Sequence, residues 1–277
     1  MVNKASVSSF LPSISIVIPS LNSGAFIEET IQSLVNQKYP HLEIIVYDGN
    51  STDATISILR KWEHAITWVS ESDKGQSEAI NKGLVRSHGE ILGYLNADDF
   101  LLPGSLYKIG LTFAQTSKSI WWITGQCQIF NAKGQRIRLL IEKYKNFFLR
   151  YFPNINFLYL TNFISQPATF WKRSVWEKIG GLDETFHYAM DYDYWIRIWK
   201  RFGRPHIIHQ PLAGFRVHPT SKTSLQGHQK AYVEEEEMIL QSHDVSFTIR
   251  ILHRIHRLGM TLVYRTINEH KIALLQR

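Results

Sequence analysis

Residues 14–22 read Ile-Ser-Ile-Val-Ile-Pro-Ser-Leu-Asn, a short β-branched run that stops at a proline and continues in polar residues. Such a run predicts a buried strand. The apolar residues of 26–35 recur at helical spacing, and residues 43–47 form a second apolar run that ends at Asp48 and Gly49. This order of strand, helix and strand is that of a βαβ unit with parallel strands.

The alternation continues as far as residue 99. Strands are predicted over residues 65–70 and 90–95, and helices over 54–62, over 77–86 and just after Pro103. Strands that alternate with helices form a parallel sheet that is covered on both faces. The predicted fold class is therefore α/β, with a Rossmann-like, mostly parallel sheet and helices on both faces.

Polar segments follow three of these strands, at residues 19–22, 48–51 and 96–99. Ligands of open α/β sheets bind beyond the carboxyl ends of the strands. Three polar loops at one edge of the sheet therefore predict one binding site.

The segment Asn96-Ala97-Asp98-Asp99 brings two adjacent carboxylates to a strand end. Adjacent carboxylates repel each other, which raises the pKa of one of them unless a cation or a donor compensates. Their oxygens suit Mg²⁺ or Mn²⁺, which bind through one or two carboxylates while phosphate oxygens complete the shell. The alternative is a pair of helix-capping aspartates before residues 101–103.

Two other polar segments fit a bound nucleotide. Asp48 can accept a hydrogen bond from a base imide or a ribose hydroxyl, or it can be a turn residue that bonds its own backbone. Asp73-Lys74-Gly75-Gln76 precedes the helix that carries Asn81. Helix starts attract anions and Lys74 adds positive charge, which suits a diphosphate; a surface turn is the alternative.

A second carboxylate cluster lies at 191–197. On a helix, Asp193 and Arg197 form an i,i+4 pair, whereas Asp191 has no partner in the local sequence. Asp191 is therefore the freer candidate for a general base, and an N-cap carboxylate is the alternative.

Three histidines lie near prolines in the region that follows. His206, His209 and His218 lack the spacing of a zinc site. His206 and His209 are expected to be exposed or satisfied by ordinary contacts. His218 is kept as a further candidate for the metal.

Composition limits the classes of function. The chain has 277 residues, a formal net charge of +7 and a sequence pI near 9.4. This charge favours anionic partners, but no recognition motif supports nucleic acid. Cys127 is the single cysteine, which indicates a reducing compartment and a buried thiol.

No targeting or spanning segment is evident in the sequence. Residues 1–10 lack the apolar region of a signal peptide, and no stretch reaches the roughly 18 apolar residues of a spanning helix. The expected location is cytoplasmic, either soluble or peripheral on the cytoplasmic face of the inner membrane.

The pattern is less regular after residue 119. Strands are expected around 119–130 and 168–171, with a helix over about 191–200. Residues 144–163 are rich in Phe, Tyr, Leu and Asn and fit ordinary core, a loop over the site or a contact with a lipid-linked acceptor. The domain prediction is a catalytic domain over 1–220 and a helical extension over 221–277.

Residues 246–277 form the basic part of this extension. Phe247, Ile255 and Leu258 share one helical face, and arginines including Arg254 lie mostly off it. A basic amphipathic helix can rest on an anionic membrane. The alternative is a helix packed on the catalytic domain or on a second subunit.

Taken together, these segments resemble the family 2 glycosyltransferases of the GT-A fold. The matching stretches are residues 15–22, 46–53, 73–83, 95–99, 180–183 and 191–197. Each stretch is weak alone, but they occur in the family's order and approximate spacing. The resemblance covers roughly residues 13–220.

The resemblance implies roles for the candidate residues. Asp191 matches the general base, Asp48 reads the nucleotide base, and Asp98 and Asp99 hold the ribose and the metal. The residues implied at the nucleotide sugar are Pro19, Ser20, Asn22, Asp48, Asp73, Lys74, Gln76, Asn81, Asn96 and Asp98.

The resemblance also implies a reaction. A sugar passes with inversion from a nucleotide-diphosphate sugar, with UDP as the expected nucleotide, to a saccharide or lipid-linked acceptor hydroxyl. The cofactor is Mn²⁺ or Mg²⁺, and the setting is bacterial cell-surface polysaccharide or glycolipid synthesis.

Three positions depart from the family pattern. Asn96 stands where many members have the first Asp of the acidic motif, Gly49 replaces a frequent second Asp, and Met190 replaces a frequent Glu. The metal shell therefore depends on Asp98 and Asp99.

Two other functions compete with transfer. A sugar nucleotidyltransferase should have a basic, glycine-rich loop after its first strand, which residues 19–24 lack. A non-catalytic nucleotide-sugar-binding protein would have no need to retain Asp191 together with the acidic pair.

Overall fold

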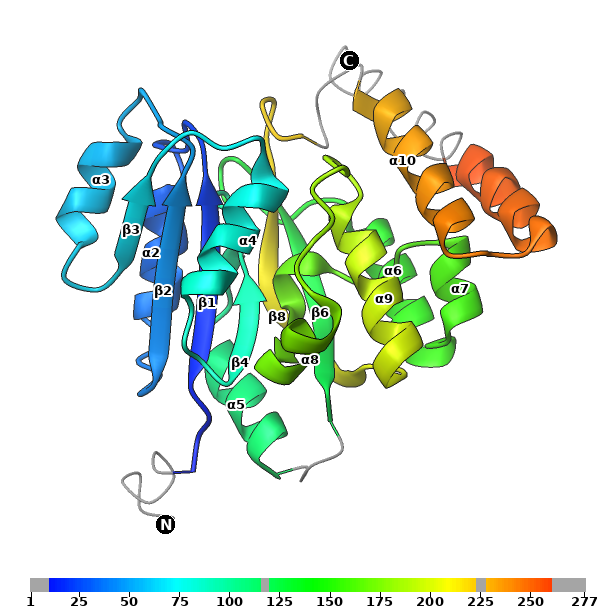
Figure 1. The fold of residues 1–277 in the computed structure, drawn as a ribbon, viewed down its shortest axis with the longest axis horizontal. Coiled ribbons are helices and arrows are strands. Elements are labelled where there is room, and N and C mark those ends of the chain that lie inside the picture. The colour runs from blue at the N-terminus through cyan, green and yellow to red at the C-terminus, as the bar shows by residue number, and fades with distance from the viewer. Residues whose placement is uncertain (1–9, 116–119, 223–227, 261–277) are drawn as a thin grey trace.

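The computed structural model describes residues 10–115, 120–222 and 228–260. Within them, eight strands form one sheet in the order β3-β2-β1-β4-β7-β6-β8-β5 (Figure 1). The elements of the first half are β1 Ile14–Ser20, α2 Ile27–Val35, β2 Leu42–Asp48, α3 Thr55–Trp62, β3 Thr67–Ser70, α4 Gln76–Arg86 and β4 Ile91–Tyr94.

The remaining elements lead into the C-terminal helices. They are β5 Phe100–Leu101, α5 Ser105–Gln115, β6 Trp122–Asn131, α6 Leu139–Tyr151, α7 Ile155–Leu160, the 3₁₀ turn Gln166–Ala168, β7 Thr169–Lys172, α8 Arg173–Ile179, α9 Met190–Phe202, β8 His206–Val217 and α10 His228–Ser242. A further helix covers residues 247–260.

The first strand shows why both faces of the sheet are covered. Every residue of β1 is buried, and its side chains alternate between two cores. Val17 packs in the core that includes α4 and α9, whereas Ile16 and Ile18 pack in the core that includes α2, α3 and α5. The predicted α/β fold with helices on both faces is confirmed.

The sheet is mixed rather than parallel throughout. Strands β3, β2, β1 and β4 are parallel, as predicted, but β7 runs antiparallel to both β4 and β6. Strand β8, which the sequence pattern did not predict, pairs parallel with β6 and antiparallel with β5. Its pairing with β6 shifts register where Pro211 enters, because a proline cannot donate to the ladder.

The aromatic segment 144–163 forms parts of two helices, α6 and α7. Leu149, Leu158 and Phe163 are buried in the core that α9 shares, while Phe147 and Tyr151 are exposed. The segment therefore supplies ordinary core on one side and an apolar surface on the other.

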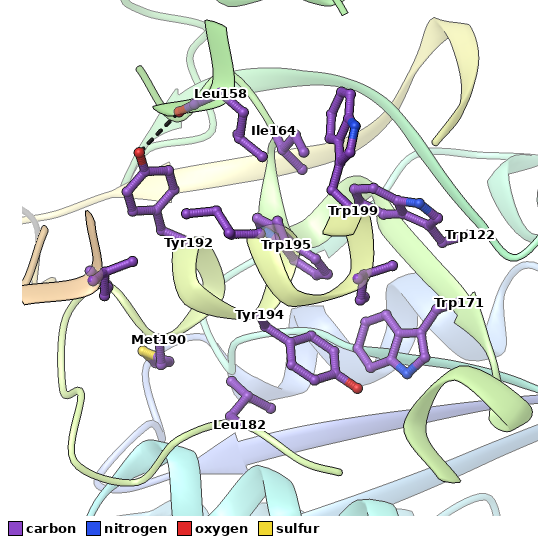
Figure 2. Packing of buried hydrophobic residues seen from close by; sticks show 14 of the residues in the cluster. Trp122, Leu158, Ile164, Trp171, Leu182, Met190, Tyr192, Tyr194, Trp195 and Trp199 are labelled. Carbon is purple, nitrogen blue, oxygen red and sulfur yellow. Dashed lines mark hydrogen bonds between the residues drawn. The ribbon is translucent and has the colours of Figure 1, made fainter. Parts of the chain in front are cut away.

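Helix α9 is fixed by an aromatic cluster (Figure 2). The Trp195 ring centroid lies 6.0 Å from that of Trp122 and 5.7 Å from that of Trp171. The Tyr192 hydroxyl donates to the Leu158 carbonyl over 3.0 Å. Truncating a buried Trp costs about 3–5 kcal/mol, so the helix that carries Asp191 is held firmly.

The C-terminal helices pack on the same core. Ile239 and Leu240 of α10 and the following Val245 belong to the cluster that contains α9. The predicted boundary between 1–220 and 221–277 therefore divides one continuous core, and it stays a prediction. No helix among the described residues has the length and apolar character needed to cross a bilayer.

Candidate active site

The loops after β1 and β2 hold each other at the carboxyl edge of the sheet. Asn22 has a left-handed backbone with φ 49°, and its N–H donates to Ser51 Oγ over 2.7 Å. Its side-chain oxygen accepts from Thr52 N over 2.9 Å. Pro19 and Ser20 end the buried strand, and Ser20 Oγ is buried with no hydrogen-bond partner among the described residues.

Asp48 makes the turn contacts that were weighed as the alternative to base recognition. Its carboxylate is fully buried and accepts from Ser51 N and Ser70 Oγ, each over 2.8 Å. Ser51 Oγ donates to the other carboxylate oxygen. Both oxygens are thus bonded within the protein, and contact with a nucleotide base stays a prediction.

Asp73 explains why residue 49 is glycine. Asp73 Oδ1 accepts from Gly75 N over 2.8 Å, and Oδ2 would lie 2.7 Å from a Cβ added to Gly49. Burial raises the pKa of Asp73, so a second acid at position 49 would meet a poorly hydrated carboxylate. Lys74 is exposed beside this turn.

A polar chain runs from Lys222, which follows β8, to the acidic loop. Lys222 Nζ donates to Gln76 Oε1 over 2.8 Å, and Gln76 Nε2 donates to Asn96 Oδ1 over 2.6 Å. Asn96 Nδ2 then donates to Asp99 Oδ2 over 3.2 Å. The sequence reading missed Lys222, which is 146 positions from its partner Gln76.

Asp99 lies inside this loop rather than on its surface. Its side chain is fully buried, and Oδ1 accepts from Arg216 N over 2.9 Å. Burial and the neighbouring Asp98 raise the pKa of Asp99 well above its usual range. Its expected part in the metal shell stays a prediction.

Asp98 is partly exposed and faces a histidine. His218 Nε2 lies 2.8 Å from Asp98 Oδ2, and His218 Nδ1 lies 2.9 Å from Thr220 Oγ1. One carboxylate oxygen and one imidazole nitrogen that face each other fit a transition-metal ion whose other ligands are phosphate oxygens. No group of three or more His, Cys, Asp or Glu that could hold an ion occurs in the described residues.

Arg216 supports the acidic loop from β8. Its Nε donates to the Asp98 carbonyl over 2.9 Å, and Nη2 pairs with Glu29 over 2.6 Å. Its guanidinium carbon lies 5.0 Å from the Phe26 ring and 5.3 Å from the Phe100 ring. The sequence reading gave Arg216 no role, because β8 was not predicted.

Asp191 lies at the start of α9 and is only partly exposed. Burial raises its pKa to about 6, against the opposing charge of Lys145. Tyr192 N donates to Asp191 Oδ1 over 2.7 Å. Asp193, by contrast, pairs with Arg197 over 2.7 Å, as predicted, and also with His243 over 2.9 Å.

The two acidic clusters converge on shared neighbours. Burial and the charges of Asp191 and Asp99 raise the pKa of the Tyr94 hydroxyl well above its usual range. Lys145 of α6, which the sequence reading missed, interacts electrostatically with both Asp191 and the buried Cys127, and Cys127 interacts with Asp99. Asp99 and Asp191 therefore both lie near enough to Tyr94 for their charges to act on it.

The segment before α9 is held from α10. Glu235 Oε1 accepts from His187 N over 2.8 Å, and Oε2 accepts from Tyr188 N over 2.7 Å and Ala189 N over 2.8 Å. Lys222 Nζ donates to the His187 carbonyl over 3.1 Å. One nearly buried carboxylate thus fixes the chain that leads into Asp191.

The amide of Asn81 is bonded within the protein, and its predicted contact with the donor stays a prediction. Asn81 Nδ2 donates to the Leu182 carbonyl and to Glu184 Oε1, each over 2.9 Å, and its Oδ1 accepts from Leu182 N. Asn81 thus connects α4 to the loop after α8. His206 and His209 are exposed, as expected.

Known proteins share this sequence pattern and this fold. The profile of glycosyl transferase family 2 matches residues 15–180, more than half of the chain. An uncharacterized glycosyltransferase of Rickettsia typhi is 26% identical over 78% of this chain and 67% of its own length. A Campylobacter jejuni GalNAc(5)-diNAcBac-PP-undecaprenol beta-1,3-glucosyltransferase is 26% identical over 80% of this chain and 70% of its own.

Two solved structures show the same fold. The mannosyltransferase PcManGT of Pyrobaculum calidifontis, in complex with GDP-Man and Mn²⁺, matches with a TM-score of 0.63 and 17% identity over 98% of this chain and 82% of that one. Residues 1–349 of Staphylococcus aureus TarS with UDP-GlcNAc match with a TM-score of 0.62 and 17% identity, over 82% of this chain but 65% of that one. The chain belongs to glycosyltransferase family 2 and has the GT-A fold.

Proposed function

We propose that this protein transfers a sugar with inversion from a nucleotide-diphosphate sugar to an acceptor hydroxyl, with Asp191 as the general base. The observation that carries the proposal is the carboxylate of Asp191, whose pKa burial raises to about 6 and which acts on Tyr94 together with Asp99 of the acidic loop. A base is most effective when its pKa lies near the working pH. Asp191 takes the acceptor proton as the hydroxyl attacks the anomeric carbon.

The donor is proposed to lie on the loops that follow β1, β2 and β4. Lys222 and the first turn of α4, at Gln76, provide positive charge for a diphosphate. Pro19, Ser20 and Asp73 line the edge where the base and ribose are expected. UDP stays the expected nucleotide, since TarS was solved with UDP-GlcNAc, although PcManGT was solved with GDP-Man.

The metal is proposed to bind Asp98 and His218, with Asp99 anchoring the loop behind them. Imidazole suits Mn²⁺ better than Mg²⁺, which prefers oxygen ligands. A bound cation would offset the negative charge that develops on the departing diphosphate. Asn96, which is bonded to Gln76 and Asp99, keeps the loop in place.

The acidic limb of the pH profile tests the base. Because burial raises the pKa of Asp191 to about 6, the carboxyl is protonated below that pH and cannot accept a proton. We expect kcat/KM to rise with pH and to level off above about 6. Lys145 lowers this pKa, so Lys145→Met should move the limb to higher pH. A limb that stays in place in this variant would contradict the assignment.

Glu235 is proposed to position the base. Glu235→Ala leaves three N–H groups before α9 without their acceptor, so the segment that leads into Asp191 should shift. A displacement of about 1 Å at a reacting group can cost roughly a hundredfold in rate. We expect kcat to fall at least about tenfold, with partial recovery in Glu235→Gln, which keeps one acceptor oxygen. The control is Glu234→Ala, whose side chain is 60% exposed. Equal kinetics of the Glu234 and Glu235 variants would contradict this role.

A direct assay separates transfer from the alternatives. Purified protein would be screened by thermal shift against nucleotide sugars with Mn²⁺ or Mg²⁺, since a ligand that binds only the folded state raises its stability. Slow hydrolysis of the stabilising donor would support a transferase. Binding without any donor cleavage would favour a non-catalytic nucleotide-sugar-binding protein, and release of pyrophosphate from a nucleoside triphosphate would favour a nucleotidyltransferase.

A further inference from the structure

The helix over residues 247–260 is oriented opposite to an ordinary amphipathic helix. Phe247, Ile255 and Leu258 are 68%, 60% and 64% exposed. A polar side chain faces the protein instead: His253 is 3% exposed, and its Nδ1 lies 3.0 Å from the carbonyl oxygens of Tyr159 and Leu160. A helix on a water-facing surface normally buries its apolar stripe.

Ion pairs to α10 fix this orientation. Arg254 Nη2 lies 2.8 Å from Glu237 Oε2, and Arg257 Nη2 lies 3.3 Å from Glu237 Oε1. The helix, orange-red in Figure 1, therefore lies beside α10 with Arg254 and Arg257 directed at Glu237. The predicted apolar face of Phe247, Ile255 and Leu258 is therefore directed outward, and whether it rests on a membrane stays a prediction.

Helix α6 extends the same surface. Leu140, Phe147 and Tyr151 are exposed, and the rings of Phe147 and Tyr151 lie 5.3 Å apart. Tyr144 is on this stripe, four residues after Leu140 and three before Phe147, and its hydroxyl bonds to His256 of the C-terminal helix. The two exposed stripes therefore adjoin across the contact between Tyr144 and His256.

The exposed charges on the two segments that carry these stripes are basic, although Glu237 of the neighbouring α10 pairs with two of the arginines. In residues 132–152 the single acid is Glu142, which is buried and paired with Arg136, while Lys143 and Arg150 are exposed. Residues 245–260 contain no acid. Lys143 and Arg150 give the apolar surface a basic edge that matches an anionic bilayer, whereas two copies meeting face to face would bring these like charges together.

We propose that the exposed stripes of α6 and residues 247–260 form one docking face for an anionic lipid bilayer. Apolar surface of this kind on a water-facing protein marks an interaction site. Helix α6 also carries Lys145, whose charge acts on Asp191, so the helix that docks is also a neighbour of the proposed base. Residues 261–277, which were included in the expected membrane contact, lie outside the described residues.

Co-sedimentation of the full chain with vesicles tests the docking face. The vesicles are phosphatidylcholine alone or phosphatidylcholine with phosphatidylglycerol. The protein should bind the phosphatidylglycerol vesicles, and Phe247→Ser/Ile255→Ser/Leu258→Ser should bind them at least about tenfold more weakly. Lys143→Glu/Arg150→Glu should also weaken binding, but only to the anionic vesicles. The matched control is Val85→Ser, which removes a 69% exposed side chain from α4.

Several results would overturn the inference. They are unchanged binding by the triple variant, absence of binding by the unaltered chain, and a dimer in lipid-free light scattering that the triple variant dissociates. All substituted side chains are exposed, and circular dichroism would confirm that the variants fold. Nucleotide-sugar binding in lipid-free buffer should be equal in all variants. A chain that binds vesicles but no donor would contradict the proposed function and leave the docking proposal standing.

Discussion

Asp191→Asn is expected to bind the nucleotide sugar as tightly as the unaltered protein and to lose transfer by at least about a hundredfold. Asparagine keeps the size of the side chain and can still accept from Tyr192 N, so the start of α9 should be preserved. It cannot take a proton from the acceptor hydroxyl. Single-turnover transfer would measure the loss, and calorimetry with a donor and Mn²⁺ would measure binding.

Asp193 provides the matched control two residues away. Although burial pushes the pKa of Asp193 upward, the hydrogen bond from His243 and the charge of Arg197 hold it below its usual range. Asp193→Asn should therefore lower thermal stability and leave the pH profile of kcat/KM in place. A full rate of transfer in Asp191→Asn, or equal kinetic losses in both variants, would remove Asp191 from the mechanism.

The first half of the fold could be predicted because local pattern and tertiary role agree there. In β1 every apolar side chain packs on one of two faces, so a continuous β-branched run is the correct signal for a doubly covered strand. Since parallel strands end at one edge, the loops that carry Asn22, Asp48 and Asn96 could be placed together before any contact was known.

The other half of the site depends on contacts between distant residues. His218 meets Asp98 across 120 positions, and both His218 and Arg216 reach the acidic loop from β8 or just after it. That strand was missed because Pro205, Pro211 and its histidines interrupt the apolar alternation. A pattern of local spacing contains no information about such pairs.

Some motif residues also have protein partners that the local sequence does not reveal. Asp48 and Asn81 match a family motif, yet the hydrogen-bonding groups of both are bonded to protein atoms in the structure. A buried polar group needs a partner whether or not a ligand is bound, so a motif residue can be retained for its protein contacts. Glu235 is the opposite case. It lies on α10, outside every motif, yet its carboxylate holds the segment that leads into Asp191.

Asp98→Asn is expected to weaken Mn²⁺-dependent donor binding by about a hundredfold or more. Loss of a group that only supports a metal ligand typically costs about 10–100-fold in metal affinity, and loss of a ligand itself should cost at least as much. His218→Ala should have a similar effect, and it should narrow the preference for Mn²⁺ over Mg²⁺ because imidazole is the softer ligand. Calorimetry with each ion, and with the ion chelated, would give these affinities.

Asp99→Asn separates the two carboxylates of the acidic loop. The burial of Asp99 and its bonds to Arg216 N and Asn96 indicate that it anchors the loop. The main effect of the variant should therefore be a lower thermal stability. Its relative affinity for Mn²⁺ and Mg²⁺ should stay unchanged. Without metal, the donor affinity of Asp98→Asn should match that of the unaltered protein. Should Asp99→Asn abolish the metal dependence while Asp98→Asn keeps it, the ion would bind Asp99, and the loop would have to open to admit it.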